Sequence, residues 1–365
     1  MSLGADDLRF LARLARGGLL DEERARRLAD EADDGDALDR LLARELDGGA
    51  ARVEELRLTG GAPPPAIPGY RFEEPLGVGG TAVVWRAHDE RGGRDLALKV
   101  LTEEAAADAA TVRAFARESK LLGELDHPGL VRCFGAARAG ATVFTRLELI
   151  DGPSLQDALD GGRRFDEDEA LRIVVDVART LAHLEEKRIV HRDVKPGNVL
   201  IDSDGRVVLI DLGFAAEAGA ARDDGRDDVA TGTVAYLSPE QARGGAGADI
   251  RSDVYSLGVT LFQLVVGRLP FEADDDREVL AMQVLASLES KELKQRGVSV
   301  HLHYLVQKMM SKDPGERFQS WSELIRDVEE LRAGSHGLDW RGSAPASAPR
   351  RSTKRSTNPR RRRRR

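Results

Sequence analysis

Cysteine is almost absent from this chain. Cys133 is the single cysteine among 365 residues, so no intrachain disulfide can form, which favours a reducing compartment. A catalytic thiol would need a neighbouring base that the sequence does not reveal. We therefore interpret Cys133 as a small apolar residue that fills space in a strand.

Long apolar segments are also missing. The longest run that is almost free of charge covers residues 254–267, which is shorter than a membrane-spanning helix and predicts a buried core helix. The first ten residues already carry Asp6, Asp7 and Arg9, so they do not form a signal peptide. We expect a soluble cytoplasmic protein with no transmembrane segment.

Acidic residues are missing from the C-terminal end alone. The chain has a net charge of −8, but residues 341–365 hold 11 Lys/Arg and no Asp/Glu, so residues 1–340 carry −19. Residues 332–365 are rich in Gly, Ser, Ala, Pro and Arg, which predicts a disordered basic tail. The tail is either a solvated charge run or a ligand for nucleic acid, an anionic membrane surface or the acidic body. Its hydroxyl residues are candidate autophosphorylation sites: Ser352, Thr353, Ser356 and Thr357.

Helical periodicity without any strand signal marks residues 1–59. Leu8, Leu11 and Leu14 repeat at helical spacing, and Asp21 suits the start of a second helix that carries Leu28. Three or four short amphipathic helices should form a small bundle. Its core is marginal, so a structural cap and a partner-binding module both remain open. Residues 60–69 form a proline-rich linker.

Acids, an amine and an amide gather in the middle of the chain. The segment 191–198 reads H-R-D-V-K-P-G-N, and Asp211 follows shortly after it. Asp193, Lys195, Asn198 and Asp211 thus lie between short apolar runs that look like strands. Phosphoryl transfer from a magnesium nucleotide needs this set of groups.

Two upstream features agree with a nucleotide site. The glycine-bearing segment 76–85 lies between strand-like runs, so its backbone N–H groups could approach a polyphosphate. Lys99 lies on a following strand and could pair with phosphate oxygens. Glu118, on a helix predicted over residues 109–125, could fix that amine. Alternatively, Glu118 is a solvated helix residue paired with Lys120 or Arg117.

Together with these residues, further motifs make residues 70–331 resemble the bacterial Hanks-type serine/threonine protein kinases. Seven motifs stand in the family order: G-V-G-G-T-A-V-V, A-L-K-V, H-R-D-V-K-P-G-N, D-L-G, T-G-T-V-A-Y-L-S-P-E, S-D-V-Y-S-L-G and K-D-P-G-E-R-F. The resemblance implies an α+β, bilobal protein kinase fold preceded by a small all-α segment. The N-lobe, residues 70–149, would be a small antiparallel sheet with one helix, and the C-lobe, residues 153–331, would be large and helical.

The resemblance also implies a role for each matching residue. Asp193 would accept or orient the proton of the substrate hydroxyl, and Lys195 would reach the transferred phosphoryl group. The other residues with implied roles fall into four groups. The catalytic set adds Lys99, Glu118 and Thr233; the metal ligands are Asn198 and Asp211; the structural set is Glu240 paired with Arg317, and Asp253 beneath the catalytic loop; the nucleotide contacts add Leu76, Gly77, Val78, Gly79, Gly80, Val84, Ala97, Glu148, Leu149, Ile150 and Leu200.

The chain departs from the family pattern at a few positions. Ala82 replaces the third glycine of the loop and Leu212 replaces a phenylalanine, but the polar catalytic positions are intact, so we expect an active enzyme. Residues 222–228 lack a hydroxyl residue, where relatives carry phosphorylated threonines. We hypothesise that Asp227 or Asp228 takes the place of the phosphate as partner of Arg192, with Thr231 as the remaining regulatory phosphosite. A solvated flexible loop is the alternative.

The sequence thus predicts a serine/threonine protein kinase that uses ATP and Mg²⁺, or Mn²⁺, phosphorylates proteins and itself, and acts in signal transduction. Self-phosphorylation in trans would involve a homodimer, and the N-terminal helices could bind a further partner. Two rival classes are a small-molecule phosphotransferase of the antibiotic-kinase type and a non-catalytic scaffold.

Overall fold

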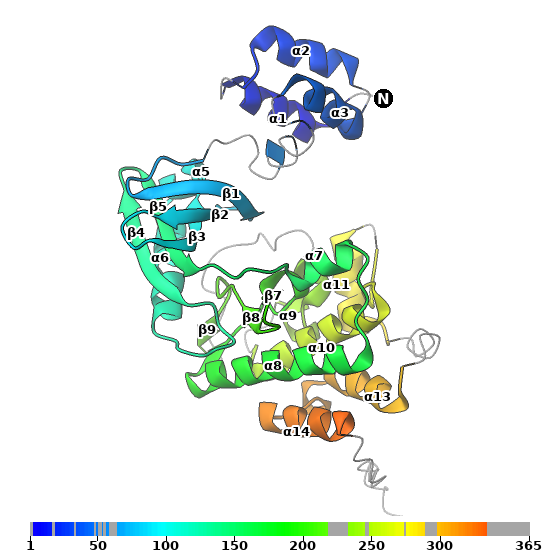
Figure 1. The fold of residues 1–365 in the computed structure, drawn as a ribbon. Helices are drawn as coiled ribbons and strands as arrows, with labels where there is room; N and C mark the ends of the chain where they lie inside the picture. The colour runs from blue at the N-terminus through cyan, green and yellow to red at the C-terminus, as the bar shows by residue number, and fades with distance from the viewer. Residues whose placement is uncertain are drawn as a thin grey trace, which may run out of the picture.

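The computed structural model describes residues 3–16, 19–32, 34–46, 49, 53, 56–57, 64–217, 233–244, 248–273, 275–288 and 298–333 (Figure 1). The predictions for Asp227, Asp228, Thr231 and the basic tail beyond residue 333 lie outside the described residues.

The predicted N-terminal helices are confirmed. The Asp21 side chain accepts a hydrogen bond from the Arg24 N–H at 2.7 Å, and Asp34 does the same for Ala37, so each aspartate begins a helix. Leucines at helical spacing, including Leu28, form a common core of their own. The helices are α1 (Ala5–Arg16), α2 (Glu22–Glu31) and α3 (Gly35–Glu45).

The small lobe is an antiparallel sheet with strand order β1-β2-β3-β5-β4. Apolar residues alternate along its strands and are buried on both faces: Trp85 and Leu98 belong to one cluster, whereas Leu101 and Val143 pack with Phe115 in another. Besides the predicted helix, α6, the lobe holds the short helix α5, which begins where the Thr102 hydroxyl accepts from the Ala105 N–H at 3.2 Å. The elements are β1 (Tyr70–Val78), β2 (Ala82–Asp89), β3 (Arg94–Leu101), α5 (Glu103–Ala107), α6 (Ala109–Gly123), β4 (Cys133–Ala139) and β5 (Thr142–Glu148).

The end of the proline-rich linker is attached to this sheet. Ile67 is only 4% exposed and packs in the same cluster as Trp85. The Gly69 carbonyl also accepts a hydrogen bond from the Glu90 N–H at 3.0 Å. The last residues of the predicted proline-rich linker, residues 60–69, thus pack on the small lobe.

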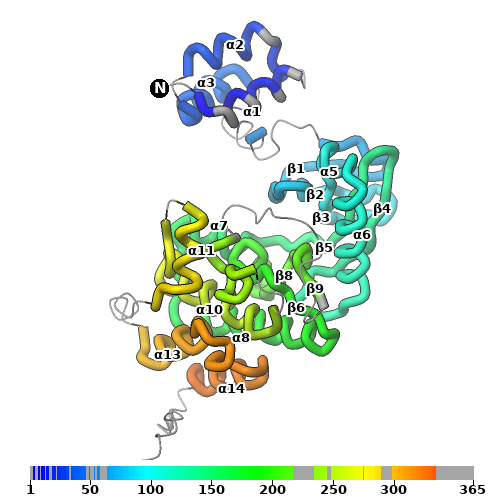
Figure 2. Tube along the Cα trace, turned by 180° about the vertical axis from the view of Figure 1, so that it is seen from behind, coloured from blue at the N-terminus to red at the C-terminus, as the bar shows by residue number. Residues whose placement is uncertain are grey.

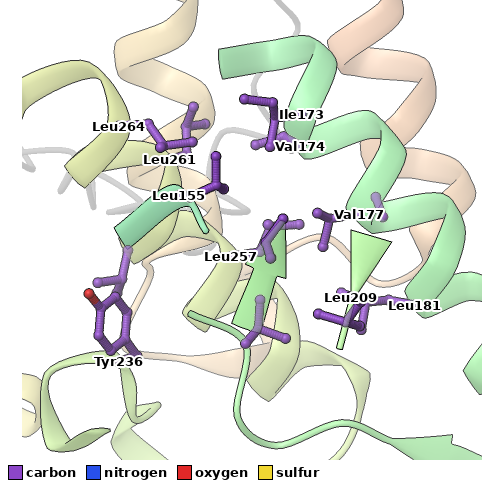
Figure 3. Packing of buried hydrophobic residues seen from close by; sticks show 14 of the residues in the cluster. Leu155, Ile173, Val174, Val177, Leu181, Leu209, Tyr236, Leu257, Leu261 and Leu264 are labelled. Atoms are coloured by element: carbon purple, nitrogen blue, oxygen red, sulfur yellow. The ribbon is translucent and has the colours of Figure 1, made fainter. Parts of the chain in front are cut away.

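The large lobe is built around one buried helix, α10. All its residues from Ser252 to Val266 are buried, as expected for the run with almost no charge. In Figure 3 its leucines, Leu257, Leu261 and Leu264, meet Val174 and Val177 of α8. The elements are α7 (Leu155–Asp160), α8 (Glu167–Glu186), β6 (Ile189–Val190), η1 (Pro196–Asn198), β7 (Val199–Ile201), β8 (Val207–Leu209), β9 (Ala216–Glu217), η2 (Thr233–Tyr236), α9 (Pro239–Ala242), α10 (Ile250–Val266), α11 (Asp276–Leu285), α13 (Val300–Met309), η3 (Pro314–Glu316) and α14 (Trp321–Arg332).

The two lobes share an apolar core. Ala97, Leu122 and Leu147 of the small lobe belong to the same buried cluster as the large-lobe residues. Figure 2 shows the small lobe from behind, with α6 lying against the sheet. This shared core fixes β3 and α6 relative to the large lobe, and both elements carry predicted site residues.

Within the described part of the chain, no helix combines the length and apolar character needed to cross a membrane.

Candidate active site

The catalytic loop is held from below by the central helix. Asp253, near the start of α10 and 2% exposed, accepts the N–H of His191 at 2.8 Å and the N–H of Arg192 at 2.7 Å. Burial raises the pKa of Asp253 to about 7, whereas these two donors lower it. The loop therefore takes its position from the centre of the large-lobe core.

Arg192 has an unusual backbone conformation. Its φ is 68°, in the left-handed region that residues other than glycine rarely occupy. The Arg192 N–H donates to Asp253, and the Arg192 carbonyl accepts a hydrogen bond from the Gln241 side-chain amide at 3.1 Å. These two contacts hold the strained residue immediately before the catalytic aspartate.

Only one of the two carboxylate oxygens of Asp193 has partners among the described residues. The Asn198 amide donates to Oδ2 at 2.9 Å, and the Lys195 ammonium lies 2.8 Å from the same atom. Oδ1 is buried and has no hydrogen-bond partner among the described residues. Because a buried carboxylate oxygen normally has a partner, Oδ1 is the atom available to accept a proton from a substrate.

Asn198 and Asp211 lie together at one end of a two-stranded ribbon. Strands β7 and β8 pair from Val199 with Leu209, and the Ile210 N–H donates to the Asn198 carbonyl at 3.0 Å. Of the two predicted metal ligands, Asn198 immediately precedes β7 and Asp211 comes two residues after the end of β8.

These two residues fit a divalent cation. The Asn198 amide nitrogen is engaged with Asp193, so its oxygen is the remaining donor atom of that side chain. The Asp211 carboxylate accepts the Gly213 N–H at 2.8 Å and stays charged, because the Lys99 charge and this bond hold its pKa well below the usual range despite burial. No group of three His, Cys, Asp or Glu within the described ranges could hold a metal alone. Magnesium commonly takes one or two protein ligands and completes its shell with phosphate and water oxygens.

Lys99 lies between two carboxylates. Its ammonium is 2.7 Å from Oε1 of Glu118 and 3.5 Å from Oδ1 of Asp211. Burial and the Asp211 charge raise the pKa of Glu118, to about 7, against the opposing effect of Lys99. The two carboxylates keep Lys99 protonated despite its burial, because they raise its pKa strongly. The structure thus brings the protonated Lys99 of the small lobe next to Asp211 of the large lobe.

The glycine-rich loop leaves open space for a ligand. Gly77 lies near the end of β1 and Gly80 in the turn to β2, and a Cβ added at either would meet no protein atom within 4 Å. The protein's own packing therefore does not explain these glycines, whereas a closely approaching phosphate would.

The predicted apolar contacts of the nucleotide base come from both lobes. Leu76 is 46% exposed and Val78 is 47% exposed, which is unusual for side chains of this size. Ala97 is buried and Val84 and Leu200 are half-buried. The exposed and half-buried members of this set would offer apolar surface from both lobes to a flat ring.

The predicted backbone contacts of the nucleotide base lie in residues 148–150, between the lobes. The Glu148 N–H already donates to the Arg132 carbonyl at 2.8 Å, so this group is unavailable to a base. The Ile150 carbonyl accepts the Gly152 N–H at 3.2 Å. The N–H groups of Leu149 and Ile150 bond to nothing in the part of the chain that the structure describes, and remain the candidate donors.

The predicted structural pair lies deep in the large lobe. The Arg317 guanidinium donates to the Glu240 carboxylate at 2.7 and 2.9 Å, and the Ser252 hydroxyl donates at 2.7 Å. Burial raises the pKa of Glu240, but Arg317 outweighs it and holds that pKa at about 2. Thr233 begins η2, and its side chain lies outside what the structure describes.

Sequence reasoning assigned no role to three residues of the large lobe whose side chains bond distant backbone groups. Gln241, Gln283 and Lys312 each bond a backbone carbonyl of a distant segment. A glutamine between acidic and apolar residues has no signal of its own. Only the position of Gln241 directly after the S-P-E motif could have drawn attention to it.

The two lobes and the groups in the cleft define a protein kinase domain. The chain belongs to the protein kinase family, because the family model for the protein kinase domain matches residues 70–328. Members of this family use ATP with a divalent cation.

Three similar curated proteins come from bacteria. The serine/threonine-protein kinase PknB of Mycobacterium leprae is 33% identical over 276 residues, which cover 74% of this chain and 44% of the relative. PrkC of Bacillus subtilis is 32% identical over 260 residues, which cover 71% of this chain and 40% of the relative. The probable serine/threonine-protein kinase SCO3848 of Streptomyces coelicolor is 33% identical over 290 residues, 77% of this chain and 42% of the relative. The chain therefore spans less than half the length of these relatives.

Proposed function

We propose that this protein is a serine/threonine protein kinase that transfers the γ-phosphoryl group of ATP to hydroxyl groups of proteins, including its own. The observation that carries this proposal is the buried, unpartnered Oδ1 of Asp193, beside Lys195 and across the cleft from the Lys99–Glu118 pair. The printed names of the relatives, serine/threonine-protein kinases, support the class of acceptor.

Each group then has a task. Lys99 binds the nucleotide phosphates, and Glu118 keeps its ammonium in place. Mg²⁺ or Mn²⁺ held by Asn198 and Asp211 would neutralise phosphate charge. Asp193 Oδ1 takes the proton of the serine or threonine hydroxyl as that oxygen bonds to the γ-phosphorus and the bond to the β-phosphate oxygen breaks. Lys195, fixed on Asp193, stabilises the charge of the transferred group.

The direct test is phosphate transfer from γ-labelled ATP with Mg²⁺ or Mn²⁺ to a basic generic protein. We expect labelled serine and threonine, no labelled tyrosine, and no transfer in EDTA. Lys99→Met should abolish most transfer, because Glu118 and Asp211 would face each other without a cation. Lys120→Met is the matched control, since that lysine lies on the same helix as Glu118 with its side chain 78% exposed. Equal rates for the wild type and Lys99→Met would contradict the proposal.

We further propose that the basic tail is a substrate of this site and binds polyanions. Its hydroxyl residues stand in two similar stretches, R-R-S-T and K-R-S-T, and its charge opposes that of the rest of the chain. Truncation at Arg341 should remove most self-incorporated label while leaving transfer to an added protein intact. Affinity for RNA or DNA should fall steeply with salt in the full chain and be absent after truncation. Unchanged self-labelling in the truncated chain would place the self-phosphorylation sites elsewhere.

Two other partners are proposals of the same kind. Self-phosphorylation between copies would make its initial rate per molecule rise with protein concentration, whereas reaction within one chain would leave that rate constant. The N-terminal bundle carries Leu8 on α1, which is 49% exposed and offers an apolar contact to a partner.

A further inference from the structure

A chain of buried polar side chains in the large lobe takes no part in the proposed chemistry. It begins at Lys312, after α13, and passes through Tyr255 of α10 to Gln283 of α11. It ends at the carbonyl of Ala235 in η2. Tyr255 and Gln283 are fully buried, so each polar atom in the chain needs its partner.

The direction of each hydrogen bond follows from the ammonium at one end. Lys312 can only donate, and it donates to the Tyr255 hydroxyl at 2.9 Å. The Tyr255 hydroxyl in turn donates to Oε1 of Gln283 at 2.6 Å, which turns the amide nitrogen of Gln283 toward the Ala235 carbonyl. Reversing the Gln283 amide would place its NH₂ against a hydroxyl whose acceptor position Lys312 already uses.

Lys312 also holds the end of α11. Its ammonium donates to the Gln283 carbonyl at 2.8 Å, in the last turn of that helix, where a cation is favourable. It lies 4.4 Å from the centre of the Phe271 ring and 5.3 Å from that of Tyr255. One side chain thus fixes both the backbone of α11 and the side chain through which α11 reaches Ala235.

The segment at the other end of the chain borders the catalytic loop. Residues 234–237, here called the 234–237 loop, are all buried. The Tyr236 carbonyl accepts the Ser256 hydroxyl at 2.7 Å, and its own hydroxyl donates to Gln263 at 2.6 Å. Burial raises the pKa of Tyr236, and the nearby charges of Asp160 and Asp193 add to this effect. The charge of Asp193 acts on Tyr236, and Gln241, four residues after the end of the loop, donates to the Arg192 carbonyl. The 234–237 loop therefore lies beside the catalytic loop, where a polypeptide that presents a hydroxyl to Asp193 would bind, whereas ATP would bind between the lobes.

From this geometry we propose that Lys312, acting through Tyr255 and Gln283, is a positioning residue for the protein substrate, because it fixes the backbone of the 234–237 loop. The inference rests on the proposed protein kinase function and adds a specific element of substrate binding to it. It predicts a separation of effects: loss of Lys312 weakens the peptide complex without changing ATP binding.

The decisive variant is Lys312→Met, which keeps the length of the side chain and removes its donors. We expect the KM for a serine peptide to rise about tenfold, with the KM for ATP unchanged. Gln283→Leu should give the same increase, and the double variant should add little to either, because both break one chain of contacts.

Lys308→Met is the matched control. Lys308 lies on α13, 3.8 Å from the centre of the Phe318 ring and 2.7 Å from Glu323 of α14, and its contacts lead away from the 234–237 loop. We expect a lower melting temperature and an unchanged peptide KM for this variant. A general effect of destabilisation would instead raise the KM for both substrates in both lysine variants.

A pH profile gives an independent readout. Burial and the charges of Arg317 and Arg243 lower the pKa of Lys312 to about 8. The other groups that face it are the Tyr255 hydroxyl and the carbonyls of α11, with Glu240 beyond Arg317. The wild-type peptide KM should therefore rise between pH 7 and 9 as Lys312 loses its proton, and Lys312→Arg should flatten this rise.

The outcomes distinguish a failure of the proposed kinase function from a failure of the proposed role of Lys312. A wild type that phosphorylates no peptide would overturn the proposed function. An active wild type whose peptide KM is the same as that of Lys312→Met and Gln283→Leu would overturn this inference alone, as would equal increases in the KM for peptide and for ATP.

Discussion

Asp193→Asn should lower kcat for peptide phosphorylation by roughly 10²- to 10⁴-fold, the usual contribution of a positioned general base. The substitution retains the shape of the side chain, but an amide cannot take the hydroxyl proton. It also places an amide where Lys195 now pairs with a carboxylate. Steady-state kinetics with a serine peptide would measure the loss.

The fold and the nucleotide site should survive this change. Asp193 contacts the catalytic loop and not the small lobe, so stabilisation of the variant by ATP and Mg²⁺ in a melting experiment should match that of the wild type. Asp204→Asn, in the exposed turn between β7 and β8, is the matched control and should retain full activity. A kcat within tenfold of the wild type in Asp193→Asn would show that another group takes the proton.

Arg317→Met should destabilise the protein by about 3–5 kcal/mol, since it leaves the Glu240 charge in the core without its partner. The Arg317 side chain has no exposed surface, and it also donates to the carbonyls of Ser311 and Arg251 at 2.8 Å. The midpoint of urea unfolding would measure the loss. Arg326→Met, which breaks an ion pair with Asp327 on the surface, should shift that midpoint far less.

The same pair predicts how stability depends on pH. The folded pKa of Glu240, about 2, lies below its ordinary value of 4.5, so Glu240 contributes fully above pH 4.5. This contribution is lost as the pH falls from 4.5 to 2. In Arg317→Met that part of the acid dependence should disappear, and Glu240→Gln in the same background should recover part of the lost stability. An unchanged acid profile in Arg317→Met would mean that Arg317 does not set this pKa.

The fold was predictable because its signals are local and repeated. The apolar run at 254–267 lies in a buried helix, and Asp21 begins a helix as its side-chain chemistry suggests. The relative placement of Lys99, Glu118 and Asp211 could not be predicted from such local signals, because periodicity predicts a strand and a helix but no contact between them. That placement came from the resemblance to protein kinases, and the structure brings these groups together.

The remaining features depend on contacts between segments far apart in the chain. The side chains of Tyr255 and Gln283 are 28 residues apart, and Gln283 reaches a carbonyl 48 residues away. Such bonds leave no pattern, because a carbonyl partner has no residue identity. The attachment of Ile67 to the sheet was missed for a related reason: the prolines around it indicate an extended segment and say nothing about what it packs against. The hypotheses on Asp227, Asp228 and Thr231 stay predictions.

The bonds from the backbone of His191 and Arg192 to Asp253 also determine how the catalytic loop moves. Loops normally open by small local fluctuations, and their amides exchange hydrogen with solvent quickly. These two amides are instead bonded to a carboxylate on α10, which is surrounded by the large-lobe core. Their exchange therefore requires opening of that core, so the catalytic loop has the protection of a core helix and the positive φ of Arg192 is retained between turnovers.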